Sequence, residues 1–158
     1  MEEQHKSLLS YNSFHIEAQA DRFVSITDVD ALMGMRNLEP GNPVLVLGGG
    51  SNILFTKDVK GLVLKMDIRG IDLIKEDESH VYVRAGAGEN WHSFVLYVIG
   101  RNWGGIENLS LIPGNVGAAP IQNIGAYGVE LKDSFYELEA FDRKTRKVGV
   151  SIKALEVA

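Results

Sequence analysis

The amino-acid sequence predicts a globular protein of mixed α and β structure. Its 158 residues are 45% hydrophobic and 23% charged, which provides enough apolar material for a hydrophobic core. Several short apolar segments have the length and spacing of strands, and two other segments have the spacing of helices. A chain of this length can form one ordinary domain, or two small subdomains around a shared groove.

Charge and missing residue types exclude several classes of function. The formal net charge of −5 disfavours nucleic-acid binding, which depends on clustered Lys and Arg. Without cysteine there is no disulfide, no cysteine-ligated iron–sulfur cluster and no thiol nucleophile. The four histidines lack the spacing of a metal site. The polar start from Met1 to Lys6 is unlike a signal peptide, and no apolar run is long enough to span a membrane. We therefore expect a soluble, cytoplasmic protein that binds neither metal, membrane nor nucleic acid.

The first part of the chain contains one strand pattern and one helix pattern. Apolar and polar residues alternate from Phe14 to Gln19, which predicts a short half-buried strand. Thr27 is the predicted N-cap of a helix whose apolar residues lie at i, i+3 and i+4. That helix should end by Asn37, because the turn cluster at 40–43 contains two prolines.

A glycine-rich turn follows the strongest strand signal. The continuous apolar run from Val44 to Leu47 predicts a strand that is covered on both faces. Gly48-Gly49-Gly50-Ser51-Asn52 comes directly after it, and such a turn can direct backbone N–H groups at an anion. Further strands are predicted at Leu62 to Met66, Ile71 to Ile74 and Val81 to Ala85.

A second helix and a hairpin are predicted in the remainder. Asn90 is the predicted N-cap, and Gly100 ends the helix. Its apolar face comprises Trp91, Phe94, Val95 and Val98. Leu138 to Ala140 and Val148 to Val150 predict a hairpin with the turn Asp142 to Lys147. We interpret this basic turn as a solvated hairpin tip and not as a binding patch.

The stretch from Asn108 to Val129 carries no formally charged side chain, although its glycines and prolines prevent a long helix or strand. A buried loop needs partners for its backbone polar groups, and a bound ligand can supply them. The alternative is a compact, self-packed surface loop. Neutral hydrogen-bonding side chains in the stretch are Ser110, Asn115, Gln122 and Asn123.

The glycine motifs do not match the common nucleotide loops. Gly48 to Asn52 lacks the Gly-Lys-Ser/Thr of a phosphate loop, and Ile53 occupies the third glycine position of a dinucleotide fingerprint. The segment from Gly86 to Trp91 likewise has no glycine at the third glycine position of the dinucleotide fingerprint. Either Gly48 to Asn52 is an ordinary tight turn, or it is a pyrophosphate site built from backbone amides without lysine. Together, these segments favour a large, mostly uncharged ligand with a phosphate group, such as a flavin dinucleotide.

Residues for acid–base or nucleophilic catalysis are few. His92 is expected to be a surface or packing residue. Glu107 and Glu130 flank the uncharged stretch, but the sequence shows no set of nucleophile, base and orienting residue to which they could belong. Tyr127 can stack on a planar ring or pack on the core. No catalytic residue and no metal ligand is therefore predicted, and either a cofactor performs the chemistry or the catalytic groups lie elsewhere.

Three segments closely resemble the UDP-N-acetylenolpyruvoylglucosamine reductases, a family of bacterial cell-wall enzymes. They are VLVLGGGSNILF (44–55), GAGENW (86–91) and IENLSLIPGNVGAAPIQNIGAYGVE (106–130). The resemblance extends from about Tyr11 to Val150 and concerns the amino-terminal flavin-binding part of the family. It implies an α+β bipartite domain of the vanillyl-alcohol-oxidase type, with non-covalent FAD between two subdomains at 1–70 and 71–158.

The resemblance also implies which residues hold the cofactor. Gly48, Gly49, Gly50, Ser51 and Asn52 would surround the FAD pyrophosphate. The rest of the cofactor would be lined by Ile112, Pro113, Gly114, Gly117, Ala118, Ile121, Gln122, Asn123, Gly125 and Ala126.

The family reaction implied is reduction of UDP-N-acetylglucosamine enolpyruvate to UDP-N-acetylmuramate, with NADPH as the hydride donor through FAD. The arginine, serine and carboxylate that complete the family's active site would all come after Ala158, so we expect this chain alone not to complete the reaction. We also expect a monomer. The alternatives are a non-catalytic flavin or nucleotide-binding module, and a different oxidase on the same flavin fold.

Overall fold

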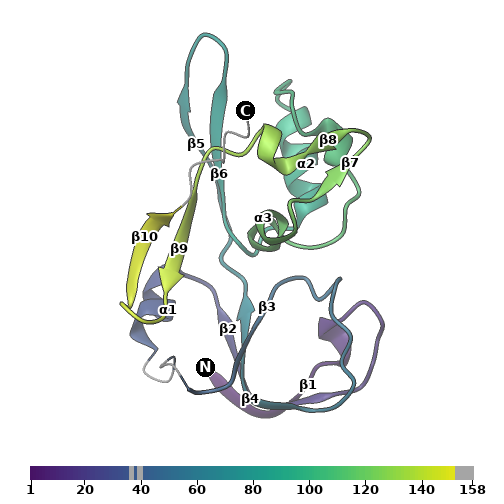
Figure 1. Cartoon of the computed structure of the whole chain (residues 1–158), viewed down its shortest axis with the longest axis vertical. Helices are drawn as coiled ribbons and strands as arrows, with labels where there is room; N and C mark the ends of the chain where they lie inside the picture. The colour runs from purple at the N-terminus through teal and green to yellow at the C-terminus, as the bar shows by residue number, and fades with distance from the viewer. Residues whose placement is uncertain (36–37, 39–40, 152–158) are drawn as a thin grey trace.

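The structure is a computed structural model that describes residues 1–35, 38 and 41–151. Its elements form two lobes, drawn in the lower and upper halves of Figure 1. The first lobe contains a four-stranded sheet and helix α1, and the second contains helices α2 and α3. Mixed sheets and separate helices confirm the predicted α+β class.

The sheet of the first lobe has the strand order β1-β2-β4-β3. Strand β1 is antiparallel to β2, whereas β2, β4 and β3 are mutually parallel. The strands are β1 (Glu2–Ser7), β2 (Gln19–Ile26), β3 (Val44–Leu47) and β4 (Val59–Met66). The carboxyl ends of the parallel strands therefore meet at one edge of the sheet, and Gly48 follows β3 at that edge. Open α/β sheets commonly bind ligands at this edge.

Strand β3 is confirmed at Val44–Leu47, but the prediction that both its faces are covered is wrong. Leu47 is 2% exposed, whereas Val46 is 57% exposed. The reason is that β3 is the last strand of the sheet, and Val46 lines a pocket instead of a packed layer.

The predicted strand from Phe14 to Gln19 is also wrong. Residues 12–18 form a loop, and β2 begins only at Gln19. The side chain of Asn12 holds this loop by donating to Leu8 O and Ile16 O and by accepting from Ile16 N. An asparagine amide that satisfies the backbone in this way competes with strand pairing.

Helix α1 (Val29–Gly34) begins one residue later than predicted. Its N-cap is Asp28, whose carboxylate accepts from Ala31 N at 2.6 Å, and not Thr27. An ionised carboxylate is the stronger acceptor and also interacts favourably with the helix dipole. The predicted limit at Asn37 lies outside the described residues.

Helix α2 organises the core of the second lobe. It spans Trp91–Ile99 with Asn90 as N-cap and Gly100 after it, as predicted. Trp91, Val95 and Val98 are buried. The uncharged stretch and the residues on either side of it pack around them as short elements, as expected from the glycines and prolines. These are 3-10 helices at Glu107–Leu109, Val116–Ala118 and Leu131–Asp133, α3 (Ala119–Gln122), β7 (Gly125–Ala126) and β8 (Val129–Glu130).

Two hairpins flank the lobes. Strand β5 (Ile71–Glu76) pairs with β6 (Val81–Ala85), and β9 (Leu138–Asp142) pairs with β10 (Lys147–Ser151), all as predicted in position. Strands β9 and β10 lie beside α1 in Figure 1, so the chain returns to the first lobe after forming the second.

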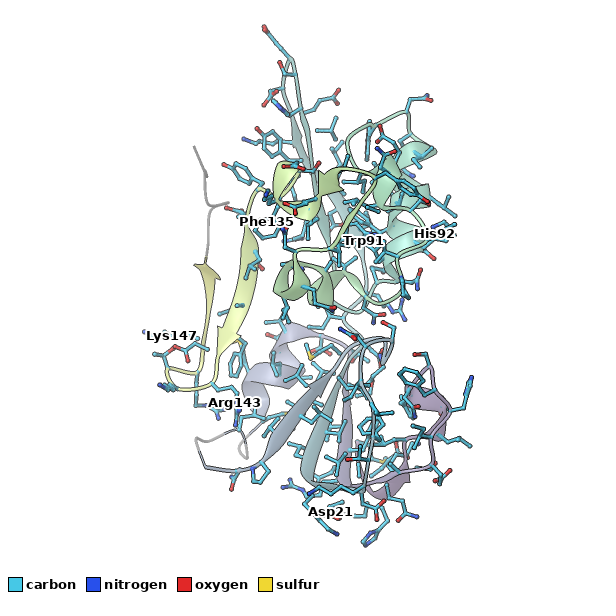
Figure 2. All side chains as sticks on the ribbon, turned by 45° about the vertical axis from the view of Figure 1, so that its right-hand side comes forward. Asp21, Trp91, His92, Phe135, Arg143 and Lys147 are labelled. Atoms are coloured by element: carbon cyan, nitrogen blue, oxygen red, sulfur yellow. The ribbon has the colours of Figure 1, made fainter. Side chains whose placement is uncertain are left out.

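The interpretation of the turn between β9 and β10 as a solvated tip is wrong. Arg143 Nε donates to Leu38 O at 3.1 Å, and Figure 2 shows Arg143 close to the first lobe. Arg146 Nη2 donates to Met33 O at 2.8 Å and to Met35 O at 2.7 Å. These carbonyls end α1, where a cation is favourable for the helix dipole. Arg143 and Arg146 therefore attach the hairpin to the first lobe.

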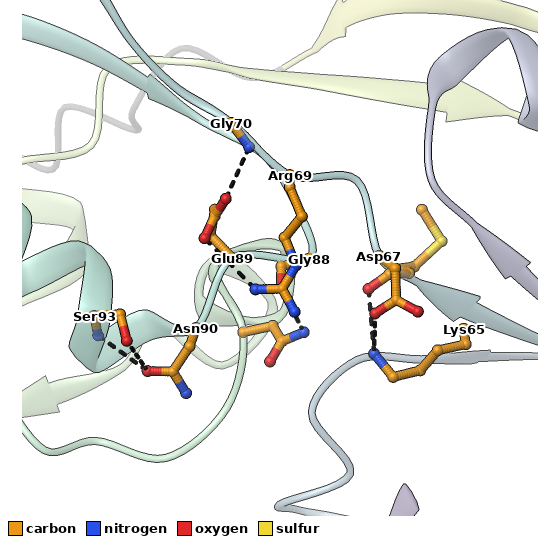
Figure 3. Close-up of polar contacts among 10 residues, drawn as sticks. Lys65, Asp67, Arg69, Gly70, Gly88, Glu89, Asn90 and Ser93 are labelled. Atoms are coloured by element: carbon orange, nitrogen blue, oxygen red, sulfur yellow. Dashed lines mark hydrogen bonds and ion pairs between the residues drawn. The ribbon is translucent and has the colours of Figure 1, made fainter.

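The lobes are joined where three backbone segments cross. Gly86 N donates to Gly70 O and Gly88 N to Ile68 O, each at 2.8 Å. Gly117 N then donates to Ala87 O at 3.0 Å, which adds the third segment. A side chain at Gly88 would place Cβ 2.6 Å from Asp67 Cα, so this glycine is required by the close crossing of backbone. Figure 3 shows Glu89 at the same junction, where it accepts from Gly70 N at 2.8 Å.

Beside this junction, the carboxylate of Asp67 stabilises the ends of β2 and β4 in a pH-dependent way, through Ser25 and Lys65. Burial raises the pKa of Asp67, but hydrogen bonds from Lys65 and Ser25 outweigh it, so the pKa lies below its usual value. A lowered folded pKa means that the stabilisation is present above the unfolded pKa of about 3.9 and is lost as pH falls through the folded pKa. We expect Asp67→Asn to lower the free energy of unfolding by about 1 kcal/mol at pH 7 and by much less near pH 2.5.

Urea denaturation of wild type and variant at both pH values measures this difference. Asp72→Asn is the matched control, because its ion pair with Arg84 is more than half exposed on both sides and should contribute little at either pH. An Asp67→Asn deficit that is equal at the two pH values would contradict the assignment.

None of the helices in the described part of the chain is long and apolar enough to cross a membrane.

Candidate functional site

A pocket of about 190 Å³ lies between the two lobes. One wall is the end of β3 and the turn after it, from Val46 to Ile53. The opposite wall comes from the second lobe and consists of Trp91, Pro113, Gly114, Asn115, Ala118, Ala119, Gln122 and Ile124. The sheet edge and the uncharged stretch therefore face each other across one site.

The pocket brings together nine of the fifteen predicted cofactor residues. They are Gly48, Gly49, Gly50, Ser51, Asn52, Pro113, Gly114, Ala118 and Gln122. A second, more open hollow of about 600 Å³ is lined in part by Asn123, Gly125 and Ala126. Ile112, Gly117 and Ile121 line neither hollow.

The turn after β3, whose residues line the pocket, has unused backbone donors. Among the described residues, no protein acceptor is hydrogen-bonded to the amide N–H of Gly49, Gly50, Ser51 or Asn52. The carbonyl of Gly50 is used, because it accepts from Ser13 N at 3.1 Å. Successive free amides in a turn form an anion-binding concavity, and they do so without a lysine.

The opposite wall adds donors of the same kind. In the part of the chain that the structure describes, the N–H groups of Gly114 and Asn115 also have no protein acceptor. Asn52 Nδ2 donates to Gln122 Oε1 at 2.7 Å, so the two walls are already connected by one hydrogen bond. Both walls thus carry backbone donors, and none of the described residues that line the site has a charged side chain.

Two of the predicted glycines are needed for contacts within the protein. A Cβ at Gly49 would lie 2.8 Å from Asn115 Oδ1 and 3.1 Å from Gly114 Cα on the opposite wall. A Cβ at Gly117 would lie 2.6 Å from Ala87 Cβ, at the junction of the lobes. Gly49 lets the walls approach each other, and Gly117 fixes the position of the second wall.

Several pocket residues were missed by the sequence analysis. They are Val46, Leu47, Ile53, Trp91, Ala119 and Ile124. Trp91 and Val46 appear in the sequence only as core residues of a helix and a strand. Asn115 also lines the pocket; the sequence indicated it as a neutral hydrogen-bonding residue of the uncharged stretch, but it was not among the fifteen residues assigned to the cofactor.

The titratable groups near the site do not form a catalytic set. His92 Nδ1 lies 3.1 Å from Ser110 Oγ and 3.2 Å from Leu111 N, so it supports the loop before Pro113. At the second hollow, the hydrogen bond from Lys132 holds the pKa of Glu130 below its usual value, which keeps it ionised. Within the described residues no group of three or more His, Asp or Glu is arranged to hold a metal ion.

A family comparison identifies the class of protein. The family described as "FAD binding domain" matches residues 23–148, and the chain belongs to this family. The match includes both walls of the pocket.

The relatives identify the kind of enzyme that the chain is similar to. It is 48% identical over 141 residues to UDP-N-acetylenolpyruvoylglucosamine reductase from Flavobacterium johnsoniae, which covers 89% of this chain and 42% of that protein. It is 51% identical over 140 residues to the reductase of the same name from Amoebophilus asiaticus, covering 87% of this chain and 41% of that protein. The resemblance drawn from the sequence is therefore confirmed, and the chain spans less than half the length of these relatives.

A solved structure supports the fold. The crystal structure of UDP-N-acetylenolpyruvylglucosamine reductase from Thermus caldophilus superposes with a TM-score of 0.71 at 22% identity. The superposition covers 96% of this chain and 51% of that one.

Proposed function

We propose that the chain binds FAD non-covalently between its two lobes, with the pyrophosphate against Gly48 to Asn52. The observation that carries the proposal is the pair of facing walls with free backbone N–H groups and no charged lining side chain. Amide donors suit the oxygens of a pyrophosphate, and the neutral apolar lining suits the remainder of a flavin nucleotide. The residues present are thus of the right chemistry for this cofactor.

The enclosed volume sets how much of the cofactor lies inside. Pockets for drug-sized ligands usually measure about 300–1,000 Å³, whereas this pocket measures about 190 Å³. It therefore has space for the pyrophosphate and an adjoining sugar, and the rest of FAD would extend beyond it. The predicted residues Ile112, Gly117, Ile121, Asn123, Gly125 and Ala126 remain proposals for the surrounding cofactor environment.

We further propose that this is the FAD-binding part of an NADPH-dependent reductase. The substrate would be UDP-N-acetylglucosamine enolpyruvate and the product UDP-N-acetylmuramate, as in the relatives' name and the resemblance above. FAD, when bound, supplies the hydride-transfer chemistry. The residues of this chain bind and orient the cofactor, and the catalytic acid–base groups would belong to a part of the enzyme outside the 158 residues.

The finer structural expectations belong to the same proposal. They are the vanillyl-alcohol-oxidase type of bipartite domain, a division into subdomains at 1–70 and 71–158, a monomeric state, and a cytoplasmic location without nucleic-acid partners. The two lobes and the sheet-edge pocket support the bipartite arrangement.

A second candidate is a flavin-binding module without catalysis. It is favoured by one observation, the lack of any charged side chain among the residues that line the pocket. Such a module would share the FAD site and differ only in what happens after binding.

Flavin titration tests the proposal. Trp91 lines the pocket, so its fluorescence should be quenched when FAD binds, and the protein should stay yellow after desalting. FMN has one phosphate and should bind at least about tenfold more weakly, because a pyrophosphate uses more of the amide donors. Equal affinity for FMN and FAD, or no binding of FAD, would overturn the pyrophosphate assignment. Reduction of bound FAD by NADPH under anaerobic conditions would favour the reductase over the non-catalytic module.

A further inference from the structure

Two polar residues are buried in the described part of the chain, and they differ in how their amides are used. Asn12 is 4% exposed and Asn115 is 9% exposed. Both ends of the Asn12 amide are bonded within the protein: Nδ2 donates to Leu8 O and Ile16 O, and Oδ1 accepts from Ile16 N. Asn12 is therefore a fully satisfied structural residue.

Only the nitrogen of the Asn115 amide is used inside the protein. Nδ2 donates to Gly88 O at 3.2 Å. This contact also determines the orientation of the amide, because the carbonyl of Gly88 can face a donor but not another oxygen. Throughout the described residues no protein donor is bonded to Asn115 Oδ1, and Asn115 lines the pocket between the lobes.

The surroundings of this oxygen explain why it is left open. It would lie 2.8 Å from a Cβ at Gly49, so only a glycine there leaves it uncovered. In the described part of the chain, the backbone N–H groups of Gly49, Gly50, Ser51, Asn52, Gly114 and Asn115, which all line the same pocket, have no protein acceptor. Oδ1 is thus a fixed acceptor beside a cluster of donors. A bare anion can use the donors but has nothing to offer the acceptor.

We propose that Asn115 is a specificity-determining residue whose Oδ1 accepts a hydrogen bond from a sugar-type hydroxyl next to the pyrophosphate of the ligand. In FAD the pyrophosphate is flanked on both sides by such hydroxyls, from the ribitol chain and from the ribose. Asn115 thereby favours a nucleotide over an inorganic anion at the same amides. This inference rests on the proposed function, since it takes FAD as the ligand.

The test compares FAD with inorganic pyrophosphate in wild type and Asn115→Ala. Loss of one hydrogen bond should weaken FAD binding roughly fivefold to tenfold. The inhibition constant of pyrophosphate, measured by displacement of FAD, should change less than twofold. Asn115→Leu, which has a similar side-chain volume, provides the same comparison if the alanine variant does not fold.

Asn12→Ala is the matched control for losing a buried asparagine. It should lower the melting temperature without changing the ratio of FAD affinity to pyrophosphate affinity. Three results would overturn the proposal. The Asn115 variants could weaken the binding of FAD and of pyrophosphate equally, they could leave the FAD affinity unchanged, or pyrophosphate could fail to displace FAD from the wild-type protein. Absence of FAD binding by wild-type protein would instead overturn the proposed function, and the Asn115 assignment with it.

Discussion

Gly50→Ala is expected to lower the free energy of unfolding by about 3 kcal/mol or more and to abolish FAD binding. Gly50 has φ of +69°, a backbone conformation that disfavours side chains. The added Cβ would also lie 1.9 Å from Tyr11 O and 2.8 Å from Tyr11 C. Both contacts are with backbone, so relief requires the turn after β3 to move away from residues 11–12. That movement would disperse the four amides that face the pocket.

Urea denaturation measures the stability change, and FAD titration at a temperature where the variant is folded measures binding. Gly34→Ala is the matched control, because a Cβ at Gly34 would meet no atom of the described residues within 4 Å. The control should retain wild-type stability and FAD affinity. If the folded Gly50 variant bound FAD as tightly as wild type, the turn would not be the pyrophosphate site.

Trp91→Ala should destabilise the second lobe by about 3–5 kcal/mol. Trp91 is 3% exposed, belongs to the core of that lobe, and packs edge-on against Phe94 with ring centroids 5.8 Å apart. Its indole Nε1 donates to Leu109 O at 2.7 Å, so truncation leaves a cavity and an unpaired buried carbonyl. The loss should also weaken FAD binding, since Trp91 lines the pocket.

Two variants separate these contributions. Trp103→Ala removes the other tryptophan, which is half-buried and packs at the margin of the same core, and should cost less than half as much. Trp91→Phe keeps an aromatic ring but removes the donor to Leu109 O, so it should cost about 1–3 kcal/mol. Calorimetric or urea unfolding of the three variants gives the values. A Trp91→Ala cost no larger than that of Trp103→Ala would contradict the central packing role of Trp91.

The elements with a local signal were predictable. Helix α2 carries its own N-cap, its own apolar face and a terminal glycine, so Asn90 to Gly100 was predicted with its boundaries. Strands β3 and β6 are short apolar segments between turns and were also located correctly. Strands β1 and β2 were missed, because all six residues of β1 are polar and β2 begins where the Asn12 loop ends.

Only part of the candidate site was predicted, because only some of its residues carry a local signal in the sequence. Residues Gly48 to Asn52 stand out because glycines directly follow a strand, and the stretch from 108 to 129 stands out because it lacks charge. No local pattern in the sequence indicates which residues of that stretch face the pocket. Gly114 does so, whereas Gly117 packs on Ala87, and only the crossing of backbone segments at the junction decides between them.

By itself, the sequence determined that two uncharged, glycine-containing segments exist and that their residues resemble those of flavin-binding reductases. Both facts depend on residue types and their order, which are properties of single segments. Tertiary structure alone decided that the two segments face each other, that Asn115 points its acceptor between them, and that the basic turn of the last hairpin caps α1. These are contacts between residues far apart in the chain, and they depend on how the lobes pack and not on any local preference.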